Sequence, residues 1–281
     1  MSLGWPARSS SLAWSNPLAW WWSFLALVSV ANIAVWLSLY LYFQESEFGT
    51  ASGNKVMLSL SAAYVFGCAF RSFLPRADVQ RICLFDTWLS SVAIGRSVAT
   101  VAEICFAAQW MIILHRLGMV TGAATTLSAA WLIVPLILVA ECFSWHAVLT
   151  RNYLGHAIEN SIWAVCFLMI AIGLCRLLPD FAGAARAVLI VTIVGIAGYL
   201  AFLVTIDVPM YLKRWQAESD HGSGRLSHLE GLWDVSLRWV VMHDMTEWKD
   251  EIAWMSLYFS VAVWASLALC VCYAFAGHLP R

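Results

Sequence analysis

Seven apolar stretches, each long enough to cross a lipid bilayer as a helix, constrain this 281-residue sequence more than any other feature. A bilayer core of ~30 Å takes about 20 predominantly apolar residues in helical form. Only 12% of the residues are charged, whereas soluble domains carry about 25%, so neither a soluble enzyme nor a disordered chain is expected. The sequence therefore predicts an all-α transmembrane helix bundle that forms a single domain over residues 1–281. The expected spans run over about 20–43, 56–73, 83–114, 123–143, 156–175, 185–208 and 252–276.

The one long polar connection between the expected spans covers residues 213–250. Its part at 218–225 is rich in glycine and polar residues, which is typical of an exposed loop. Between residues 226 and 242, Leu229, Leu232 and Leu237 recur at near-helical intervals together with Trp233 and Val240. This spacing predicts an amphipathic helix that lies in the membrane interface.

Basic residues are unequally divided between the two sides that seven spans define. The side that holds the N-terminal segment, denoted side A, receives ten Lys and Arg residues, and the opposite side, side B, receives five. Basic loops are retained in the cytoplasm, so the N-terminus is expected to be cytosolic and the C-terminus to lie on the other side. The side A residues are Arg8, Arg71, Arg76, Arg81, Arg151, Lys213, Arg214, Arg225, Arg238 and Lys249; those of side B are Lys55, Arg116, Arg176, Arg186 and Arg281.

The composition also limits which classes of binding partner are expected. A net charge of −1 provides no basic field for nucleic acid, so no nucleic-acid partner is expected. Membrane lipids are the expected partners, and the 17 tryptophans suit a protein with a large membrane interface or one covered by other membrane subunits. The eight cysteines form no C-x-x-C pair and are interpreted as small apolar packing residues.

Two ionisable residues, Arg96 and Glu103, fall inside the third expected span. They are seven residues apart, about two turns, so they share one face of the helix but are expected to be too distant to pair directly. A charge inside a bilayer is costly unless it is paired. Arg96 is therefore expected to find a carboxylate on another helix, Glu141 or Glu159.

Most other membrane-adjacent polar groups converge on side A, which predicts a polar cavity open to that side at headgroup depth. Charged residues and histidines lie where the fourth span ends, where the fifth begins, where the sixth ends and where the seventh begins. Three of them, on the approach to the seventh span, fall at i, i+4 and i+8 and form one stripe. The candidate binding residues are Arg96, Glu103, His146, Asp207, His243, Glu247 and Glu251, and the candidate catalytic residues are Glu141, His156 and Glu159.

Several kinds of chemistry fit these residue types. Carboxylates and imidazoles from facing helices can bind iron, manganese or zinc, with Glu141, His146, His156, Glu159, His243 and Glu247 as candidate ligands. The same groups can perform metal-free acid and base catalysis on a lipid, in which a histidine transfers a proton and a carboxylate orients it. Headgroup or ion binding without chemistry, and purely structural pairing, also remain open. No G-x-S-x-G, H-E-x-x-H, P-loop or dinucleotide fingerprint is present.

Two stretches of the sequence resemble the multi-pass membrane proteins that remodel GPI-anchor lipids, the FRAG/DRAM-like superfamily. One is Pro75-Arg76-x4-Arg81, followed by Ser90, Ser91 and Arg96. The other is Glu141-x7-Leu149-Thr150, followed by His156-x-x-Glu159-Asn160, and the aromatic run with Glu251, Trp254 and Tyr258 is similar as well. The resemblance, over about 110 residues, implies a protein that acts on lipid acyl chains, with Arg96, Glu141, His156 and Glu159 as the functional residues.

The sequence thus predicts an integral, multi-pass membrane protein that binds or remodels lipids, and it leaves open whether the protein is an enzyme. A solute or ion transporter that uses the same cavity is one alternative, and a non-catalytic subunit of a larger membrane complex is another. A cavity that opens laterally between spans favours the lipid function. A continuous polar path to side B favours transport, and apolar flanks covered by other chains favour the subunit.

Overall fold

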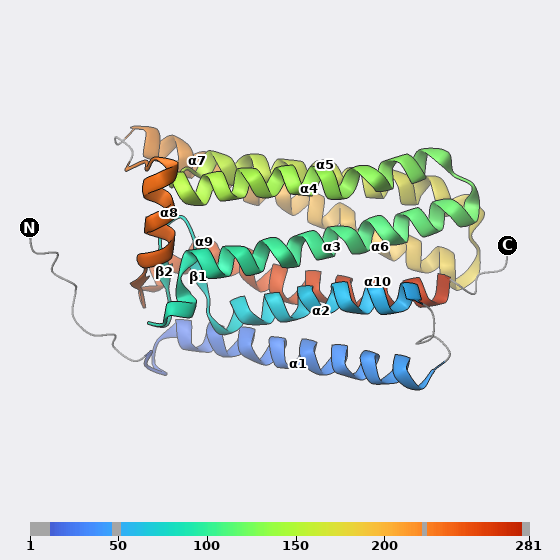
Figure 1. Ribbon diagram of the computed structural model, residues 1–281, viewed down its shortest axis with the longest axis horizontal. Helices are drawn as coiled ribbons and strands as arrows, with labels where there is room; N and C mark the ends of the chain where they lie inside the picture. Colours follow the sequence, from blue (N-terminus) through green and yellow to red (C-terminus); the bar gives the residue numbers. More distant parts are fainter. Residues whose placement is uncertain (1–11, 47–51, 221–223, 277–281) are drawn as a thin grey trace, which may run out of the picture.

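A computed structural model describes residues 12–46, 52–220 and 224–276 as a bundle of long helices (Figure 1). Seven helices in the described residues are long and apolar enough to cross a membrane, which confirms the predicted all-α bundle. Arg8 and Arg281, two members of the basic tally, lie outside the described residues. The cytosolic position of side A stays a prediction.

The first five spans are single α-helices that run back and forth through the bundle. They are α1 (Pro17–Glu45), α2 (Ser52–Phe73), α3 (Val92–Thr121), α4 (Ala124–Thr150) and α5 (Tyr153–Leu177). Consecutive helices pack against each other as antiparallel neighbours. Two short 3-10 segments, Trp88–Ser90 and Leu178–Asp180, precede α3 and follow α5.

The last two spans each contain a π-helical segment near the side A half of the bundle. The sixth consists of α6 (Gly183–Phe202), a π segment (Leu203–Asp207) and α7 (Val208–Asp220). The seventh consists of α9 (Met245–Leu257), a π segment (Tyr258–Ala262) and α10 (Val263–Ala276). Such segments, which widen the turn by one residue, are frequent at functional sites.

Four of the predicted spans differ from the observed helices by seven residues or more, and the fourth span does so because it continues to Thr150 rather than ending at about residue 143. The third begins at Val92 rather than at about residue 83, because the apolar residues before it, including Ile82 and Cys83, are buried in a small sheet. The sixth continues as α7 to Asp220, so the predicted connection at 213–250 starts later. The seventh begins at Met245 and therefore includes several polar residues that were assigned to the connection.

Close helix contacts in the bundle need residues without side chains. A Cβ atom on Gly67 of α2 would lie 2.9 Å from the Cβ of Ala102 on α3. A Cβ on Gly155 of α5 would lie 2.5 Å from the carbonyl oxygen of Phe143 on α4. Both distances are shorter than van der Waals contact, so these glycines set how closely α2, α3, α4 and α5 approach.

The seventh span is attached to the core by buried polar groups. Gln109 of α3 is fully buried, and its side-chain nitrogen donates to the carbonyls of Met57 on α2 and Ser266 on α10, at 3.4 and 3.3 Å. The Ser266 hydroxyl donates to the Gln109 side-chain oxygen at 2.6 Å. Polar groups inside a bilayer must be satisfied within the protein, so this network fixes α10 against α2 and α3.

The sixth and seventh spans pack against different helices of the bundle. Of the sixth span, α6 buries only Leu189 and Ile196 and packs mainly against α5. The helix α10 of the seventh span instead packs mainly against α2 and α3. The sixth span therefore packs on one side of the bundle and the seventh on another, and residues of both line a common cavity.

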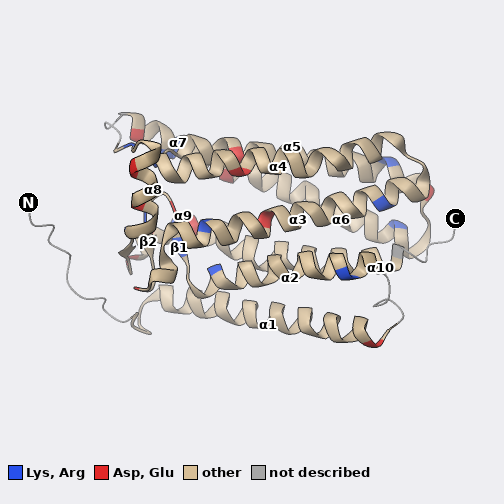
Figure 2. Ribbon diagram, viewed as in Figure 1, with Lys and Arg blue, Asp and Glu red and all other residues tan. Residues whose placement is uncertain are grey.

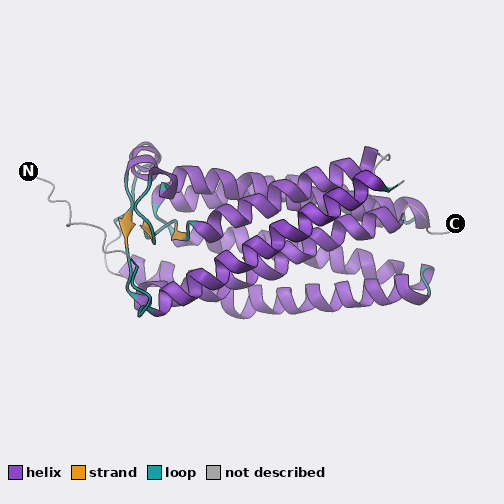
Figure 3. Cartoon of the chain, turned by 90° about the horizontal axis from the view of Figure 1, so that it is seen from below, coloured by secondary structure: helices purple, strands orange, loops and turns teal. Residues whose placement is uncertain are grey.

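A small sheet closes the side A end of the bundle (Figure 3). Its strands are β1 (Arg76–Ala77), β2 (Ile82–Cys83) and β3 (Val240–Val241), in the order β1-β2-β3, with β1 antiparallel and β3 parallel to β2. Arg81, in the turn of this hairpin, donates to the Asp234 carboxylate at 2.7 Å and to the carbonyl of Val148 at 2.8 Å. One arginine thus joins the sheet, α4 and the helix that carries Asp234.

That helix, α8 (His228–Leu237), lies across the bundle end, within the stretch where an amphipathic helix is predicted (Figure 1). It buries Gly231 and Val235 against α4 and α3. Its outward apolar side chains, which include Leu229, Leu232, Trp233 and Leu237, are exposed. A Cβ on Gly231 would lie 2.1 Å from the carbonyl oxygen of Leu149, so the glycine permits the docking. The membrane-interface position of α8 stays a prediction.

Charged residues are concentrated at this closed end and in the adjoining half of the bundle (Figure 2). The buried Asp78 carboxylate, between β1 and β2, accepts from the Arg76 Nε at 2.8 Å and lies 3.6 Å from the Arg71 Nη2. Burial alone raises the pKa of Asp78, but the guanidinium groups of Arg71 and Arg76 outweigh it and hold the pKa below its ordinary value of 3.8.

The depressed pKa of Asp78 predicts acid-sensitive stability of the side A end. A carboxylate with a lower pKa in the folded state stabilises the fold above its unfolded pKa, and this contribution is lost as pH falls through the folded pKa. The melting temperature in detergent should therefore fall as pH decreases below about 4. Asp78→Asn should cost about 1–3 kcal/mol at neutral pH and reduce that slope, whereas Asp180→Asn, at an exposed position on side B, should change neither. An unchanged slope in Asp78→Asn would contradict the assignment.

Candidate functional site

The half of the bundle next to side A contains a buried ion cluster centred on Arg96. The Arg96 Nη2 lies 2.8 Å from an oxygen of Glu141, 3.2 Å from Glu103 and 3.5 Å from Glu159. These four side chains come from α3, α4 and α5, and each is less than a tenth exposed. Glu141 also accepts from the Thr100 hydroxyl at 2.6 Å. The prediction that Arg96 pairs with Glu141 or Glu159 is confirmed.

The prediction that Arg96 and Glu103 are too far apart to pair is wrong. Helical side chains tilt toward the N-terminus, so Glu103 leans back toward Arg96 along their common face. The long arginine side chain covers the rest of the two-turn separation, and the Nη2–Oε1 distance is 3.2 Å. Two side chains seven residues apart on a helix can therefore form an ion pair when the first of them is an arginine.

A histidine and carboxylate pair adjoins this cluster on α5. The Nδ1 atom of His156 lies 2.6 Å from the Oε2 atom of Glu159. An ionised carboxylate can only accept, so Nδ1 carries the hydrogen and the unprotonated Nε2 is the basic atom. The imidazole also lies against the ring of Tyr211, with a centroid distance of 5.2 Å. Glu159 is thereby held between the Arg96 guanidinium and the His156 ring, and it fixes the orientation of both.

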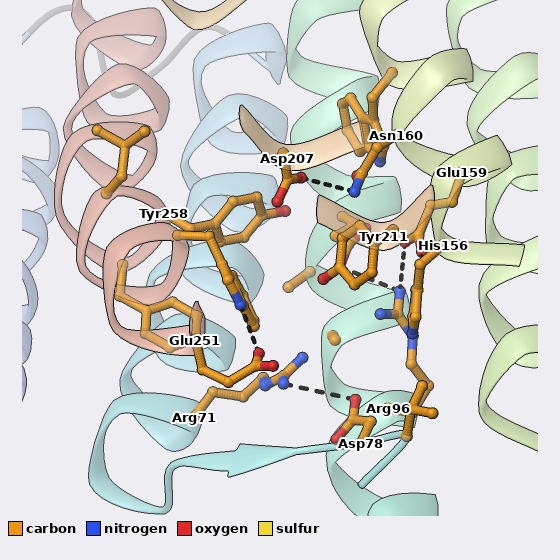
Figure 4. Close-up of a pocket in the computed structure, with 18 of the residues that line it drawn as sticks. Arg71, Asp78, Arg96, His156, Glu159, Asn160, Asp207, Tyr211, Glu251 and Tyr258 are labelled. Carbon is orange, nitrogen blue, oxygen red and sulfur yellow. Dashed lines mark hydrogen bonds and ion pairs between the residues drawn. The ribbon is translucent and has the colours of Figure 1, made fainter. Parts of the chain in front are cut away.

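These groups line a polar cavity of about 100 Å³ between α2, α3, α5, α7 and α9 (Figure 4). A water molecule occupies ~30 Å³ in the liquid, so the cavity has room for only a small polar group. Basic, acidic and aromatic side chains meet in it. The lining includes Arg71, Asp78, Arg96, Glu103, Tyr153, His156, Glu159, Asn160, Trp163, Tyr199, Asp207, Tyr211, Arg214, Glu251, Trp254, Tyr258 and Phe259.

Two further carboxylates of the cavity have donors of their own. Glu251 of α9 accepts from Arg214 at 2.7 Å, from Gln80 at 2.8 Å and from the Trp254 indole at 2.7 Å. Asp207, at the end of the π segment that follows α6, accepts from the Asn160 amide at 2.7 Å (Figure 4). These contacts connect the sixth span to α9 and α5 at the wall of the cavity.

A larger, apolar chamber adjoins the polar cavity. Its volume is about 540 Å³, and it lies between α3 and α5 on one side and the sixth and seventh spans on the other. The polar cavity and the chamber are adjacent, because five residues belong to both linings: Trp163, Tyr199, Phe202, Leu257 and Tyr258. Small residues of the two outer spans make the room, namely Gly195, Gly198, Ala262, Ala265 and Ala268.

Seven of the ten predicted site residues lie together in this region. Six line the cavity, namely Arg96, Glu103, His156, Glu159, Asp207 and Glu251, and Glu141 lies behind Arg96. The other three lie elsewhere because the polypeptide directs their side chains away. His146 contacts His228 of α8 at 3.1 Å, His243 contacts the carbonyl oxygen of Leu84 at 2.9 Å, and Glu247 is exposed. The stripe of His243, Glu247 and Glu251 therefore contributes only its last member.

Of the candidate metal ligands, the structure brings Glu141 and Glu159 together with Glu103. Ligand oxygens of these three carboxylates lie within 4.8 Å of one another, which is the only such group among the described residues. The Arg96 guanidinium occupies the position among them where a cation would bind. His146, His243 and Glu247 are too far from the cluster to complete a metal site with these carboxylates.

Sequence reasoning missed several groups of the cavity. Arg71 was expected only to reach side A and Arg214 only to add to its basic residues, although both line the cavity. Tyr199 and Tyr211 were not noted at all. Their position on the sixth span, eight residues before and four residues after Asp207, is the signal that could have indicated them, because such spacings return to the same side of a helix.

The fold and the site together define a helix bundle with seven helices that are long and apolar enough to cross a membrane, and with a buried polar cavity next to an apolar chamber. Comparison with family models, with curated proteins and with solved structures finds no match to this chain.

The Arg96 cluster leads to a prediction about stability. Removal of one partner of a buried ion pair leaves an uncompensated charge and typically costs about 3–5 kcal/mol. Arg96→Leu should therefore lower the melting temperature in detergent and the yield of folded protein. A second change, Glu141→Leu, should partly restore both because it removes one of the carboxylates left unpaired. Arg186→Leu, at an exposed position on side B, is the matched control. A silent Arg96→Leu would show that water, rather than carboxylates, solvates the arginine.

Proposed function

We propose that this protein binds a membrane lipid in its polar cavity and adjoining chamber, and that it remodels the lipid by acid and base catalysis. The observation that carries the proposal is the contact between the two spaces. A small polar cavity and an apolar chamber of about 540 Å³ share five lining residues. An amphipathic ligand, with a polar group and an acyl chain, matches both environments at once.

The location of the chamber supports lipid rather than a soluble ligand. The sixth and seventh spans flank it, and each belongs to a different packing group of the bundle. An acyl chain from the bilayer could therefore reach the chamber between these two spans. Transfer of apolar surface from lipid to protein provides little driving force, so the polar cavity would supply the selectivity.

The His156–Glu159 pair supports chemistry at the polar end. In this proposal the His156 Nε2 takes the proton of a hydroxyl, from water or from a second lipid, as the hydroxyl oxygen attacks an acyl carbonyl carbon. Glu159 stabilises the imidazolium that forms, because it accepts from Nδ1 at 2.6 Å. The imidazolium then returns the proton to the departing alkoxide, so an ester bond breaks as a new ester or an acid forms. Glu141 acts as a positioning residue, because it contacts Arg96 rather than the cavity.

The resemblance to proteins that remodel GPI-anchor lipids fits this proposal, since the residues that carry it include Arg96, Glu141, His156 and Glu159. All four lie in or directly beside the cavity. The lipid itself is not restricted to a GPI anchor by any contact in the site.

The chamber can be tested by filling it. Gly198 belongs to the chamber lining, and a Cβ atom on it would have no heavy atom within 4 Å, so a large side chain can be placed there without a backbone clash. Gly198→Trp should lower binding of 1-monooleoylglycerol about tenfold or more, measured by native mass spectrometry in detergent, while the protein stays folded. Val194→Trp is the matched control, because Val194 is 65% exposed and outside the chamber lining. Equal binding by the two variants would reject an acyl chain in the chamber.

The catalytic part has a separate test. His156→Gln keeps a hydrogen-bonding side chain but removes the titrating ring, so proton transfer should be lost and binding retained. Lipid mass spectrometry of membranes from producing cells should show lipid products that depend on wild-type protein and fall about 10²–10⁴-fold in His156→Gln. Binding of 1-monooleoylglycerol should change less than about twofold. His115→Gln, which alters a histidine beside Trp131 at the opposite half of the bundle, should behave as wild type. Undiminished product in His156→Gln would reject the base role.

A further inference from the structure

Arg71 is a buried cation of the polar cavity whose hydrogen-bonding capacity is largely unused. It lies in the last turn of α2, is 7% exposed and lines the cavity (Figure 4). Its ion-pair partner among the described residues is Asp78, and the Nη2–Oδ2 distance of 3.6 Å exceeds that of a hydrogen bond. A guanidinium has five N–H donors, and in the described part of the chain Arg71 donates to no protein group within hydrogen-bond distance.

The Asp78 carboxylate does not neutralise Arg71 by itself, because it is shared. Its Oδ1 atom accepts from the Nε atom of Arg76 at 2.8 Å, a much closer contact. Two arginines thus face one aspartate at this end of the cavity. The aromatic rings of Trp254 and Phe259 lie 5.8 and 6.0 Å from the Arg71 guanidinium carbon and hold the cation in place without satisfying its donors.

The other carboxylates that face the cavity are already occupied by different donors. Glu251 accepts from three side chains, including that of Arg214, and Asp207 accepts from Asn160. Glu103 and Glu159 surround Arg96 at the deep end. At the deep end, three carboxylates thus surround one arginine, whereas at the other end Arg71, Arg76 and Arg214 share the carboxylates of Asp78 and Glu251.

We propose that Arg71 binds an anionic group of the lipid, a phosphate or a carboxylate. This inference rests on the proposed lipid function and specifies the class of its ligand. A buried guanidinium with free donors pairs best with an anion that accepts two parallel hydrogen bonds, and phosphate and carboxylate oxygens have that geometry. The cavity volume of about 100 Å³ admits such a group. The chain attached to it then lies in the apolar chamber.

The experiment compares two probes that carry the same acyl chain. Binding of 1-oleoyl lysophosphatidic acid, which has a phosphate, and of 1-monooleoylglycerol, which has none, is measured by native mass spectrometry of the full-length protein in neutral detergent. The wild type should bind the phosphate-bearing lipid about tenfold or more tightly, the effect of one or two charge-assisted hydrogen bonds. Arg71→Gln should lose this preference, and Arg71→Lys should retain part of it.

Matched controls separate the possible results. Arg116→Gln, which removes an arginine beside Tyr273 outside the cavity, should keep the wild-type preference. Equal affinity of the wild type for both probes would overturn the inference even if Arg71→Gln fails to fold. In that case, loss of both probes in Gly198→Trp would still support the lipid function. Inorganic phosphate that binds as tightly as lysophosphatidic acid, with no effect of Gly198→Trp, would identify a site for free phosphate and reject the lipid anion.

Discussion

The pairing of Arg96 with three carboxylates is the interaction on which the arrangement of the bundle depends. A guanidinium within a membrane-spanning segment is tolerated only if the protein itself supplies counter-charges. Here the counter-charges come from α3, α4 and α5, so these three helices can adopt only a rotation that directs Glu103, Glu141 and Glu159 toward one point. The glycine contacts between neighbouring helices then bring that point within hydrogen-bond distance. The cluster also holds Glu159 for His156, and a structural ion pair thereby sets the geometry of the candidate catalytic pair.

The gap between the sixth and seventh spans follows from how the last helices are attached. Gln109 and Ser266 bind α10 to α2 and α3, whereas α6 has contacts mainly with α5. The glycines and alanines of the chamber lining have side chains too short to fill the space between the sixth and seventh spans. Each of the two spans also contains a π segment, where the polar cavity and the chamber are adjacent, and these segments contribute Asp207 and Tyr258 to the site.

The helices of this fold could be predicted from the sequence because membrane spans depend on length and composition, which are local properties. The pairing of Arg96 with Glu141 and Glu159 could be predicted from the cost of an unpaired charge, although the helix positions were unknown. The position of His243 could not be predicted, because this residue lies in the short connection between β3 and α9, where its ring contacts the Leu84 carbonyl oxygen. The strands were missed for a related reason. Two-residue strands have no periodicity, and Ile82 and Cys83 have the same apolar character as the start of a helix.

The packing on the side B half of the bundle bears on the choice between lipid binding and transport. A transporter needs a polar path that continues from the cavity to the other side. Beyond the deep end of the cavity, the rings of Tyr64 and Phe106 stack at 4.5 Å, and Trp110 packs edge-on against Phe106 at 6.2 Å. Gln109, the next polar side chain along α3, is fully buried and bonded to α2 and α10. A polar solute would have to disrupt this aromatic layer, whereas a lipid would use only the space between the sixth and seventh spans to enter and to leave. Phe106 and Trp110 of this layer also line the apolar chamber, where an acyl chain would pack against them.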